Sequence, residues 1–194
     1  VNQSTIHLMG LVSAGGVHSS LDHLLSLCDV LKEWPQISVQ IHGFSDGRDC
    51  DPHSGKLYFK QLIDHINDTN INLVSLIGRY YVMDRDNRWE RIKKAYNLLI
   101  HADGKIYDNC ESAFQDQYSL GITDEFIPPI SFNQNGKIKD NDVVICFNFR
   151  TDRCRQISTV LTQKDFMDYE MRKLNLKYLT MTNYDKTFEG VDVI

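Results

Sequence analysis

Short apolar runs of strand length alternate with amphipathic helical stripes along most of this 194-residue chain. Leu21, Leu24, Cys28 and Leu31, for example, recur at helical spacing between two runs that have the composition of strands. Strands separated by helices form right-handed crossovers, which make the strands parallel and place helices on both faces of the sheet. We therefore predict an α/β fold, a three-layer α/β/α sandwich with a mostly parallel sheet. The expected strands are residues 5–12, 38–44, 72–78, 143–149 and 176–184.

Capping residues and glycines set the ends of the expected helices. Ser19 or Ser20 can cap the first helix, and Ser54 can cap the second. Asn87, followed three residues later by Glu90, resembles a capping box at the start of the third. We further expect that helix to stop at Gly104, a short helix over about 109–119 to end at Gly121, a loop or small hairpin at 126–142, and a helix at 151–161.

Charge and composition argue against several classes of protein. The formal net charge is −5, which argues against nucleic-acid binding and against binding to acidic membranes. No apolar run approaches the roughly 18–20 residues that cross a membrane, and the first residues lack the pattern of a signal peptide. The five cysteines are far apart, and Cys28 and Cys146 lie in apolar patterns, so we expect a reduced, cytoplasmic protein. Because the chain lacks an initiator Met and begins almost at once with a strand, we expect a segment of a longer chain.

Four unusual polar stretches each follow an expected strand. In open α/β sheets, ligands bind in the crevice outside the carboxyl ends of the strands. The four stretches therefore predict one composite site at that edge, and their coincidence is a stronger signal than any one of them. They are SAGGVHS (13–19), SDGRD (45–49), GRYYVMDRD (78–86) and NFRTDR (148–153).

The arginines are concentrated in and beside these stretches. Five of the nine lie inside them, three more lie where the following helices begin, and only Arg172 is remote. Arginine is preferred to lysine where a planar, bidentate donor must grip a carboxylate or a phosphate. We therefore expect a small, multiply charged anion to bind at this edge. The glycine-rich turn at 13–19 can offer backbone N–H groups to it, but this turn is neither G-x-G-x-x-G nor a Walker A loop, so nucleotide binding is not favoured.

Each stretch also has a purely structural interpretation, which the sequence leaves open. His18 alone is more typical of a cap or a satisfied surface residue. Arg79 and Arg85 can be structural partners of Asp84 and Asp86. Other structural alternatives are that Arg150 and Arg153 pair with Asp152, that the aromatics of RYY are core residues, and that Asp46 and Gly47 simply make a turn. The acidic pair of TDEF (123–126) is typical of a helix start or a turn, so we do not expect it to be catalytic. No Cys/His cluster predicts zinc, and we expect no metal site in this chain.

Six stretches, in this order and at these spacings, carry a resemblance to a known family. They are LMGLVSAGGVHSSLDHL, DGRD, GRYYVMDRDNRWER, GITDEFIPP, FNFRTDR and LTMTNYDKTF. Together they closely resemble the cofactor-independent phosphoglycerate mutases. The resemblance covers about residues 5–190 and is to the phosphotransferase, or substrate-binding, domain of that family.

The resemblance implies a two-domain enzyme. In that family an alkaline-phosphatase-like domain carries a nucleophilic serine and two divalent metals, manganese or magnesium, and the phosphotransferase domain is inserted into it. The serine takes the phosphoryl group from 3-phosphoglycerate, leaves glycerate held between the domains, and returns the group to give 2-phosphoglycerate. No stretch of 1–194 resembles the serine motif or the metal ligands, so we expect the phosphotransferase domain alone, with the phosphatase-like domain absent. Such a segment should fold independently and bind substrate without catalysing the reaction by itself.

By matching position, the resemblance implies seven substrate-site residues. Asp49 would serve as acid and base for the two hydroxyls, with Arg48 and its neighbours maintaining its charge and orientation. His18 would contact the substrate or the transferring phosphate. Several arginine forks suit a compact anion with a carboxylate and a phosphate, because phosphoryl transfer depends on positioning and charge stabilisation. The implied residues are His18, Arg48, Asp49, Arg79, Arg85, Arg150 and Arg153.

The chain departs from the usual pattern of the family at three places. Ala14 stands where the family commonly has aspartate (SDGGVHSH), Ser20 stands where it commonly has histidine, and DGRDCDP replaces the more usual DGRDTPP. None of these changes removes an implied site residue, although Ala14 can loosen the first loop. Two rival functions stay open: a stand-alone binding module for small phosphorylated acids, and a regulatory homologue whose other domain has lost its nucleophile.

Overall fold

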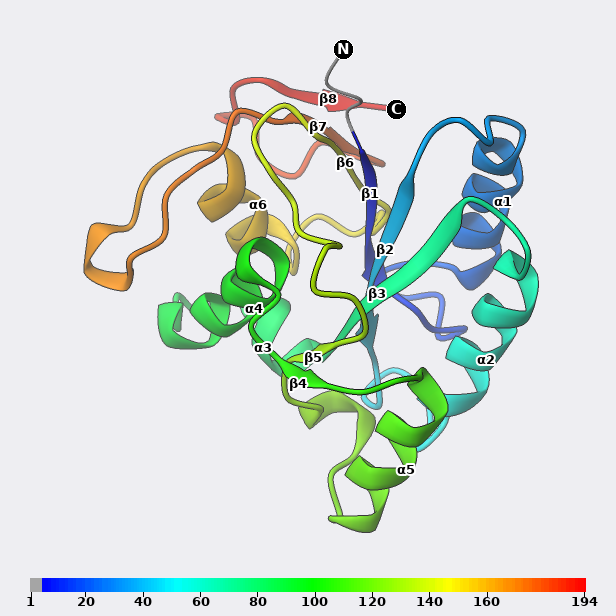
Figure 1. Cartoon of the computed structure of the whole chain (residues 1–194). Coiled ribbons are helices and arrows are strands. Elements are labelled where there is room, and N and C mark those ends of the chain that lie inside the picture. Colours follow the sequence, from blue (N-terminus) through cyan, green and yellow to red (C-terminus); the bar gives the residue numbers. More distant parts are fainter. Residues whose placement is uncertain (1–4) are drawn as a thin grey trace.

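A mostly parallel sheet forms the centre of the molecule (Figure 1). The structure is a computed structural model that describes residues 5–194. The strand order in this range is β4-β5-β3-β2-β1-β6-β7-β8, and all neighbouring pairs are parallel except β3 with β5. The strands are β1 (Ile6–Leu11), β2 (Val39–Ser45), β3 (Ile71–Gly78), β4 (Lys105–Ile106), β5 (Ile130–Ser131), β6 (Val143–Cys146), β7 (Lys177–Thr180) and β8 (Val191–Val193).

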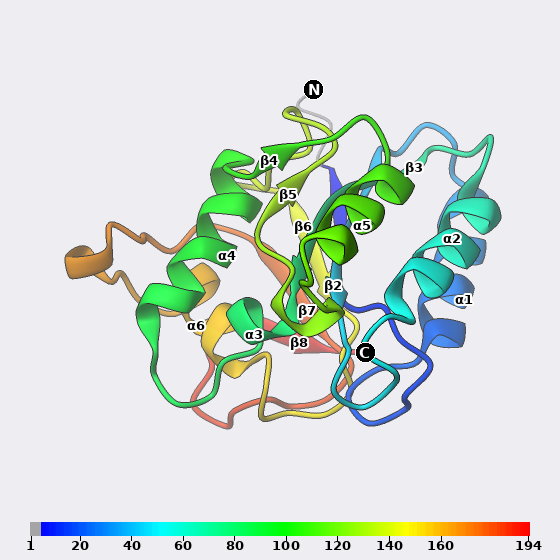
Figure 2. The ribbon, with the colours of Figure 1, turned by 90° about the horizontal axis from the view of Figure 1, so that it is seen from below.

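Helices cover both faces of the sheet (Figure 2). Helices α1, α2 and α5 pack on one face, and α4 and α6 pack on the other. This arrangement confirms the predicted three-layer α/β/α sandwich. The helices are α1 (Leu21–Lys32), α2 (Gly55–Ile66), α3 (Arg79–Val82), α4 (Trp89–His101), α5 (Cys110–Ser119) and α6 (Arg155–Thr162), with short 3₁₀ helices at Asp124–Phe126 (η1) and Met167–Tyr169 (η2).

Alternating side chains of the central strands build one core on each face. Met9 and Leu11 of β1 pack in the core beneath α4 and α6, whereas Leu8 packs in the core beneath α1 and α2. Successive side chains of a strand point to opposite faces, so a strand buried on both faces is apolar throughout. Gly43 of β2 makes room for a helix, since a Cβ at this position would collide with the ring of Phe59 in α2.

The order of the strands reverses at β1. From β1 the sheet adds β2 and β3 on one side, while β6, β7 and β8 lie on the other side. The loops that leave β1 and β6 therefore run in different directions at their carboxyl ends. This is the topological switch point, where open α/β sheets bind ligands. Residues 13–19 and 148–153 flank the switch point, and the loops after β2 and β3 come next to them.

The irregular part of the sheet differs from the sequence prediction. Of the loop or small hairpin expected at 126–142, the structure has a loop that contains the short strand β5. The hairpin alternative is wrong, because β5 pairs antiparallel with β3 and parallel with β4. Strand β6 ends at Cys146 rather than at 149. Beyond its end, the side chain of Asn148 replaces a backbone acceptor, since Asn148 Oδ1 accepts the Leu11 N–H at 2.9 Å. Strand β7 is likewise shorter than 176–184, and the helix expected at 151–161 begins at Arg155. The sequence does not predict β4 and β8, because they are only two and three mostly exposed residues long.

Both ends of α4 differ from the capping prediction. Asn87 has a left-handed φ of 59°, and its side chain makes no cap bond. Asp84 takes that role, since its Oδ2 accepts the Arg88 N–H at 2.9 Å. At the other end, Ala102 adopts a left-handed φ of 55° and ends the helix before Gly104.

The starts of α1 and α2 also lack the predicted serine caps. Ser20 and Ser54 occupy the cap positions but make no side-chain cap bond. Ser19 Oγ instead donates to a backbone carbonyl of β1 at 2.5 Å. At α2, Asp124 Oδ2 reaches across from η1 and accepts the Gly55 N–H at 2.6 Å. A distant carboxylate therefore caps this helix.

Two further observations concern the cysteines and the helices. All five cysteines carry free thiols, and Cys28 and Cys146 are buried as the apolar pattern predicts. Within residues 5–194, we find no helix that combines the length and the apolar character that a membrane span requires.

Candidate functional site

The polar stretches after β1, β2 and β3 meet in one hydrogen-bonded cluster. Arg79, at the start of α3, lies at its centre and is 3% exposed. Its Nη1 donates to Asp46 Oδ1 and to Asp49 Oδ2, both at 2.6 Å. Asp46 also accepts from Ser13 Oγ at 2.6 Å. Arg79 is therefore not paired with Asp84 or Asp86, and the structural alternative for this arginine is wrong.

Asp46 and Gly47 form the turn after β2, as the sequence predicts. Asp46 Oδ1 accepts the N–H groups of Arg48 at 3.2 Å and of Asp49 at 3.0 Å, and Gly47 has a φ of 70° that a Cβ would disfavour. Burial alone would raise the pKa of Asp46, but the bonds from Ser13, from the Asp49 N–H and from Arg79 hold that pKa below its ordinary value. The turn is thus a charged support that holds the side chain of Asp49 at the sheet edge.

The partner of Asp49 differs from the sequence expectation. Arg79 donates to Asp49, whereas Arg48 turns away from it and places its Nε 3.4 Å from Glu125 Oε1. The Arg48 side chain is 51% exposed. Gly15 of the first loop lies against the same turn, since a Cβ on it would be 2.9 Å from Asp49 O.

His18 is buried between carboxylates of two loops. Its Nε2 lies 3.5 Å from Asp49 Oδ2, and its Nδ1 lies 3.9 Å from Asp152 Oδ1. Its backbone carbonyl accepts the Phe149 N–H at 2.8 Å, which ties the loop after β1 to the loop after β6. Burial, followed by the positive charge of Arg79, lowers the pKa of His18 to about 4. The imidazole is therefore neutral at pH 7 and can donate one hydrogen bond and accept another.

Asp152 joins arginines from two different loops. Its Oδ2 accepts from Arg85 Nη1 at 2.9 Å, and its Oδ1 lies 3.1 Å from Arg150 Nε. The structural alternative that pairs Arg150 with Asp152 is therefore confirmed, but the pairing of Arg85 with its sequence neighbours is wrong. Arg153 does not pair with Asp152 either, because its Nη1 donates to Met83 O at 3.3 Å.

A polar cavity of about 200 Å³ lies beside this cluster. Four of the seven expected site residues line it, while His18, Asp49 and Arg150 lie outside its lining. Asp49 adjoins it through Arg79, and Arg150 adjoins it through Asp152 and Arg85. The cavity is lined by Arg48, Arg79, Tyr80, Met83, Asp84, Arg85, Asp86, Arg88, Arg91, Glu125 and Arg153.

Positive charge exceeds negative charge around the cavity. Its lining holds six arginines against three carboxylates. Burial, followed by the like charges of Arg85, Arg79 and Arg48, lowers the pKa of Arg153. Within residues 5–194, Arg153 Nε is buried without a hydrogen-bond partner. A bound anion would relieve the repulsion among the arginines and supply the acceptor that Arg153 lacks.

Sequence reasoning missed several residues of the cavity wall. Arg91 stacks its guanidinium 3.8 Å from the ring centroid of Tyr80, so this tyrosine is not simply a core residue. Asp84 and Arg88 lie four residues apart in the loop between α3 and α4, and their side chains pair at 3.6 Å. Glu125 has no sequence signal, because TDEF follows no predicted strand.

Across residues 5–194, no group of three or more His, Cys, Asp or Glu side chains could hold a metal ion.

Comparison with protein-family models places the chain in a family. The model described as BPG-independent PGAM N-terminus, where PGAM is phosphoglycerate mutase and BPG is bisphosphoglycerate, matches residues 1–186. The chain belongs to this family. This result confirms the resemblance that the six sequence stretches carry.

The curated relatives of this chain are much longer than the part that it matches. The 2,3-bisphosphoglycerate-independent phosphoglycerate mutase of Parabacteroides distasonis is 48% identical over 198 residues, which cover 100% of this chain and 39% of the relative. The enzyme of the same name from Clostridium tetani is 43% identical over 197 residues, which cover 99% of this chain and 38% of the relative. The chain therefore spans less than half the length of these curated relatives.

A solved structure shows the same fold for a member of the phosphoglycerate mutases. A crystal structure of Leishmania mexicana phosphoglycerate mutase at low cobalt concentration matches with a TM-score of 0.86 and 27% sequence identity. The match covers 96% of this chain and 37% of that chain.

Proposed function

We propose that this chain is the substrate-binding, or phosphotransferase, domain of a cofactor-independent phosphoglycerate mutase. The whole enzyme would interconvert 3-phosphoglycerate and 2-phosphoglycerate, and this domain would hold the glycerate while the phosphoryl group moves. The family match and the names of the relatives support the reaction class. The cytoplasm is the proposed compartment, because glycolytic intermediates are the substrates.

One observation carries the proposal most directly: arginines from three separate loops surround a small cavity in excess over carboxylates. Arg48, Arg79, Arg85 and Arg153 all line it. The lowered pKa of Arg153 and its unpartnered buried Nε are what a site prepared for an anion would show before the anion binds. Phosphoglycerate carries a carboxylate and a phosphate, so it can engage several guanidinium groups at once.

The hydrogen bonds suggest which residues would transfer a proton and which would bind the anion. Asp49 would move the proton of the glycerate hydroxyl, since Arg79 fixes one of its oxygens and leaves the side chain at the sheet edge. His18 would donate or accept a hydrogen bond as a neutral imidazole beside Asp49. Arg150 and Arg85 would be drawn from Asp152 toward the incoming anion. Arg48 and Arg153 would also bind the anion.

The remaining chemistry would come from the second domain of the same enzyme. A phosphatase-like domain would supply the serine that carries the phosphoryl group, together with two divalent metal ions, manganese or magnesium. That domain is also the proposed main partner of this one. The same anion site would serve a binding module for small phosphorylated acids that does not catalyse, which is the alternative proposal.

Titration of the ¹⁵N-labelled chain with 3-phosphoglycerate tests the site. We expect weak, saturable chemical-shift changes in the loops of His18, Arg79, Arg85 and Arg150, in the millimolar range or weaker, because the second domain is missing. Arg85→Gln should weaken binding about tenfold or more, because a charge-assisted bond is lost. The matched control is Arg172→Gln, which removes an exposed arginine far from the cavity and should leave binding unchanged. Shifts confined to regions away from these loops would refute the site.

A further inference from the structure

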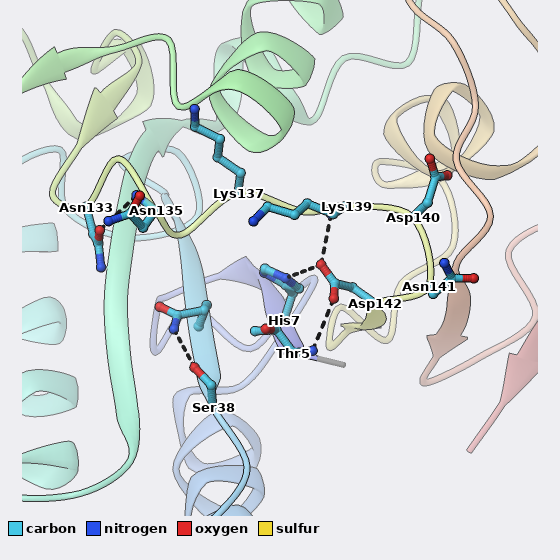
Figure 3. A pocket seen from close by; sticks show the side chains of 11 residues that line it. Thr5, His7, Ser38, Asn133, Asn135, Lys137, Lys139, Asp140, Asn141 and Asp142 are labelled. Carbon is cyan, nitrogen blue, oxygen red and sulfur yellow. Dashed lines mark hydrogen bonds and ion pairs between the residues drawn. The ribbon is translucent and has the colours of Figure 1, made fainter. Parts of the chain in front are cut away.

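A second polar cavity lies at the opposite edge of the sheet, where β1 and β2 begin (Figure 3). Its volume is about 490 Å³, which falls within the usual range of small-molecule sites, roughly 300–1,000 Å³. The loop between β5 and β6 forms one wall and the first residues of β1 and β2 form the floor. The lining residues are Thr5, His7, Ser38, Gln40, Asn133, Asn135, Lys137, Lys139, Asp140, Asn141 and Asp142.

The carboxylates of this cavity have hydrogen-bond partners among residues 5–194, whereas the ammonium groups of its lysines do not. Both carboxylate oxygens of Asp142 accept hydrogen bonds, Oδ1 from the Thr5 N–H at 3.1 Å and Oδ2 from the Lys139 N–H at 2.8 Å. Asp140 likewise accepts the Asn175 N–H at 2.8 Å outside the cavity. The ammonium groups of Lys137 and Lys139, by contrast, form no ion pair or hydrogen bond with any residue of 5–194. Two cations are therefore free beside acids that are already satisfied.

The floor of the cavity is held rigidly by a chain of buried side chains. His7 Nε2 lies 3.2 Å from Asp142 Oδ2, His7 Nδ1 lies 3.0 Å from His42 Nε2, and His42 Nδ1 lies 2.8 Å from Ser75 Oγ. With Asp142 ionised, His7 donates to it through Nε2, and His42 then donates to His7 Nδ1 and accepts from Ser75. Every ring nitrogen of the two histidines thus has a hydrogen-bond partner, so the floor presents a fixed surface to a ligand.

Free donors also line the sides of the cavity. Figure 3 shows Lys139 extending above His7 toward Asn135, and Lys137 rising from the same loop at the rim. Asn133 Oδ1 accepts the Asn135 N–H at 2.9 Å, which leaves the side-chain amide hydrogens of both residues available. On the floor, Gln40 Oε1 is buried without a hydrogen-bond partner within residues 5–194. The cavity thus offers cations and amide donors for an anion, and one acceptor for a hydroxyl.

We propose that this cavity binds a small hydroxylated metabolite through an oxyanion, either a phosphate or a carboxylate. Lys139 and the amides of Asn133 and Asn135 hold the oxyanion above His7, and Lys137 closes the rim. The site is separate from the arginine cavity, which lies at the carboxyl ends of the strands. It does not depend on the proposed mutase function.

The test is a pair of NMR titrations of the ¹⁵N-labelled chain at constant ionic strength, one with inorganic phosphate and one with malonate. We expect saturable shifts at the amides of Asn135, Lys137 and Lys139 and at the ring of His7. The Lys137→Gln/Lys139→Gln double variant should weaken this response about tenfold or more, because both charge-assisted bonds are lost. The matched control, Lys164→Gln, removes one exposed lysine outside this cavity and should change nothing.

The outcomes separate clearly. Saturable shifts with either probe support the site, and the probe that binds more tightly identifies the oxyanion as a phosphate or a carboxylate. No saturable shift at these positions with either probe, or unchanged affinity in the double variant, overturns the proposal. Shifts at His18 or Arg79 report the arginine cavity and are scored separately, so either site can fail alone. The double variant changes only loop side chains, and its folding is checked from the same spectra.

Discussion

Arg79 is the residue on which the candidate site depends most. It is buried, and one guanidinium nitrogen holds both Asp46 and Asp49. Burial is the main reason why His18 stays neutral, and the positive charge of Arg79 adds to the cost of burying an imidazolium. At this scale the site is a set of arginines whose present acceptors are carboxylates of the protein. An incoming anion would exchange with some of them.

The role of Asp49 is tested in an enzyme that joins this chain to the second domain. Asp49→Asn keeps an oxygen for Arg79 but cannot accept a proton, so kcat should fall about 10²–10⁴-fold while KM changes little. Steady-state kinetics with 3-phosphoglycerate measure this. The control is Asp51→Asn, an exposed neighbour that should leave both constants unchanged. Nearly normal turnover in the Asp49 variant would remove Asp49 from the acid–base role.

The protonation of His18 is a second prediction for a single residue. Its pKa of about 4 lies below the ordinary 6.5, so its imidazole should titrate near pH 4 in NMR spectra of the ring nitrogens. Because the folded state resists protonation, this group contributes stability that is present above pH 6.5 and is lost as pH falls toward 4. Arg150→Gln removes one positive neighbour and should raise the midpoint. A midpoint near 6.5 in the unmodified chain would contradict the electrostatic account.

Among the elements, the short helix η1 contacts three other parts of the structure, although it is only three residues long. Asp124 in η1 caps α2 through the Gly55 N–H and also accepts from Tyr118 Oη at 2.5 Å. Its backbone carbonyl accepts from Ser45 Oγ of β2 at 2.7 Å. A Cβ on Gly47 would lie 2.9 Å from the Asp124 side chain, so η1 also packs against the turn that holds Asp49. The single residue Asp124 therefore connects a helix start, a strand end and the site loop, through its carboxylate, its backbone carbonyl and its packing.

Removal of this carboxylate should destabilise the fold. Asp124→Ala leaves the Gly55 N–H and the Tyr118 hydroxyl without their acceptor, which should lower the free energy of unfolding by about 2–4 kcal/mol. Urea denaturation at pH 7 measures this change. Asp124→Asn keeps one oxygen and should cost less than the alanine variant. Equal stability of the alanine variant and the unmodified chain would show that η1 does not support α2.

The same residue gives the stability a defined pH dependence. Burial raises the pKa of Asp124 to about 6, above the ordinary 3.8. The folded state therefore binds a proton more readily than the unfolded chain, so the contribution of this group to stability rises as pH falls from 6 to 3.8. Asp124→Asn should abolish this contribution. It opposes the contribution of His18 over much of the same pH range.

For the whole molecule, the strand order decides where chemistry can occur. The loops after β1, β2, β3 and β6 lie far apart in the sequence, and the parallel sheet brings their ends to one edge. The reversal at β1 places the loop of His18 beside the loop of Asp152. The opposite edge collects a different set of residues, with His7 and Asp142 at the starts of β1 and β6. One sheet therefore carries two polar cavities at its two ends.

The sequence alone determined the layers of the fold and the edge that carries the candidate site. Apolar runs and helical stripes encode burial directly, so β1, β2, β3 and most helices follow from local pattern. The arginine-rich stretches after these strands also follow, because position after a strand fixes which edge a loop occupies. The short, exposed strands β4 and β8 have no such pattern. The two residues of β5 are buried, but a run of two is too short to signal its pairing with β3 and β4.

Only the tertiary structure decided which charges meet. Local spacing suggests Asp84 for Arg79 and Arg48 for Asp49, but Arg79 is paired with Asp46 and Asp49 across two loops. The cap of α2 comes from Asp124 rather than from Ser54, because the Asp124 carboxylate, distant in the sequence, accepts the Gly55 N–H at the start of the helix. The chain of His7, His42 and Ser75 crosses three strands and has no sequence signal. The physical reason is common to these cases: hydrogen bonds and ion pairs depend on distances of a few ångströms, and for these residues the packing of separate elements sets those distances.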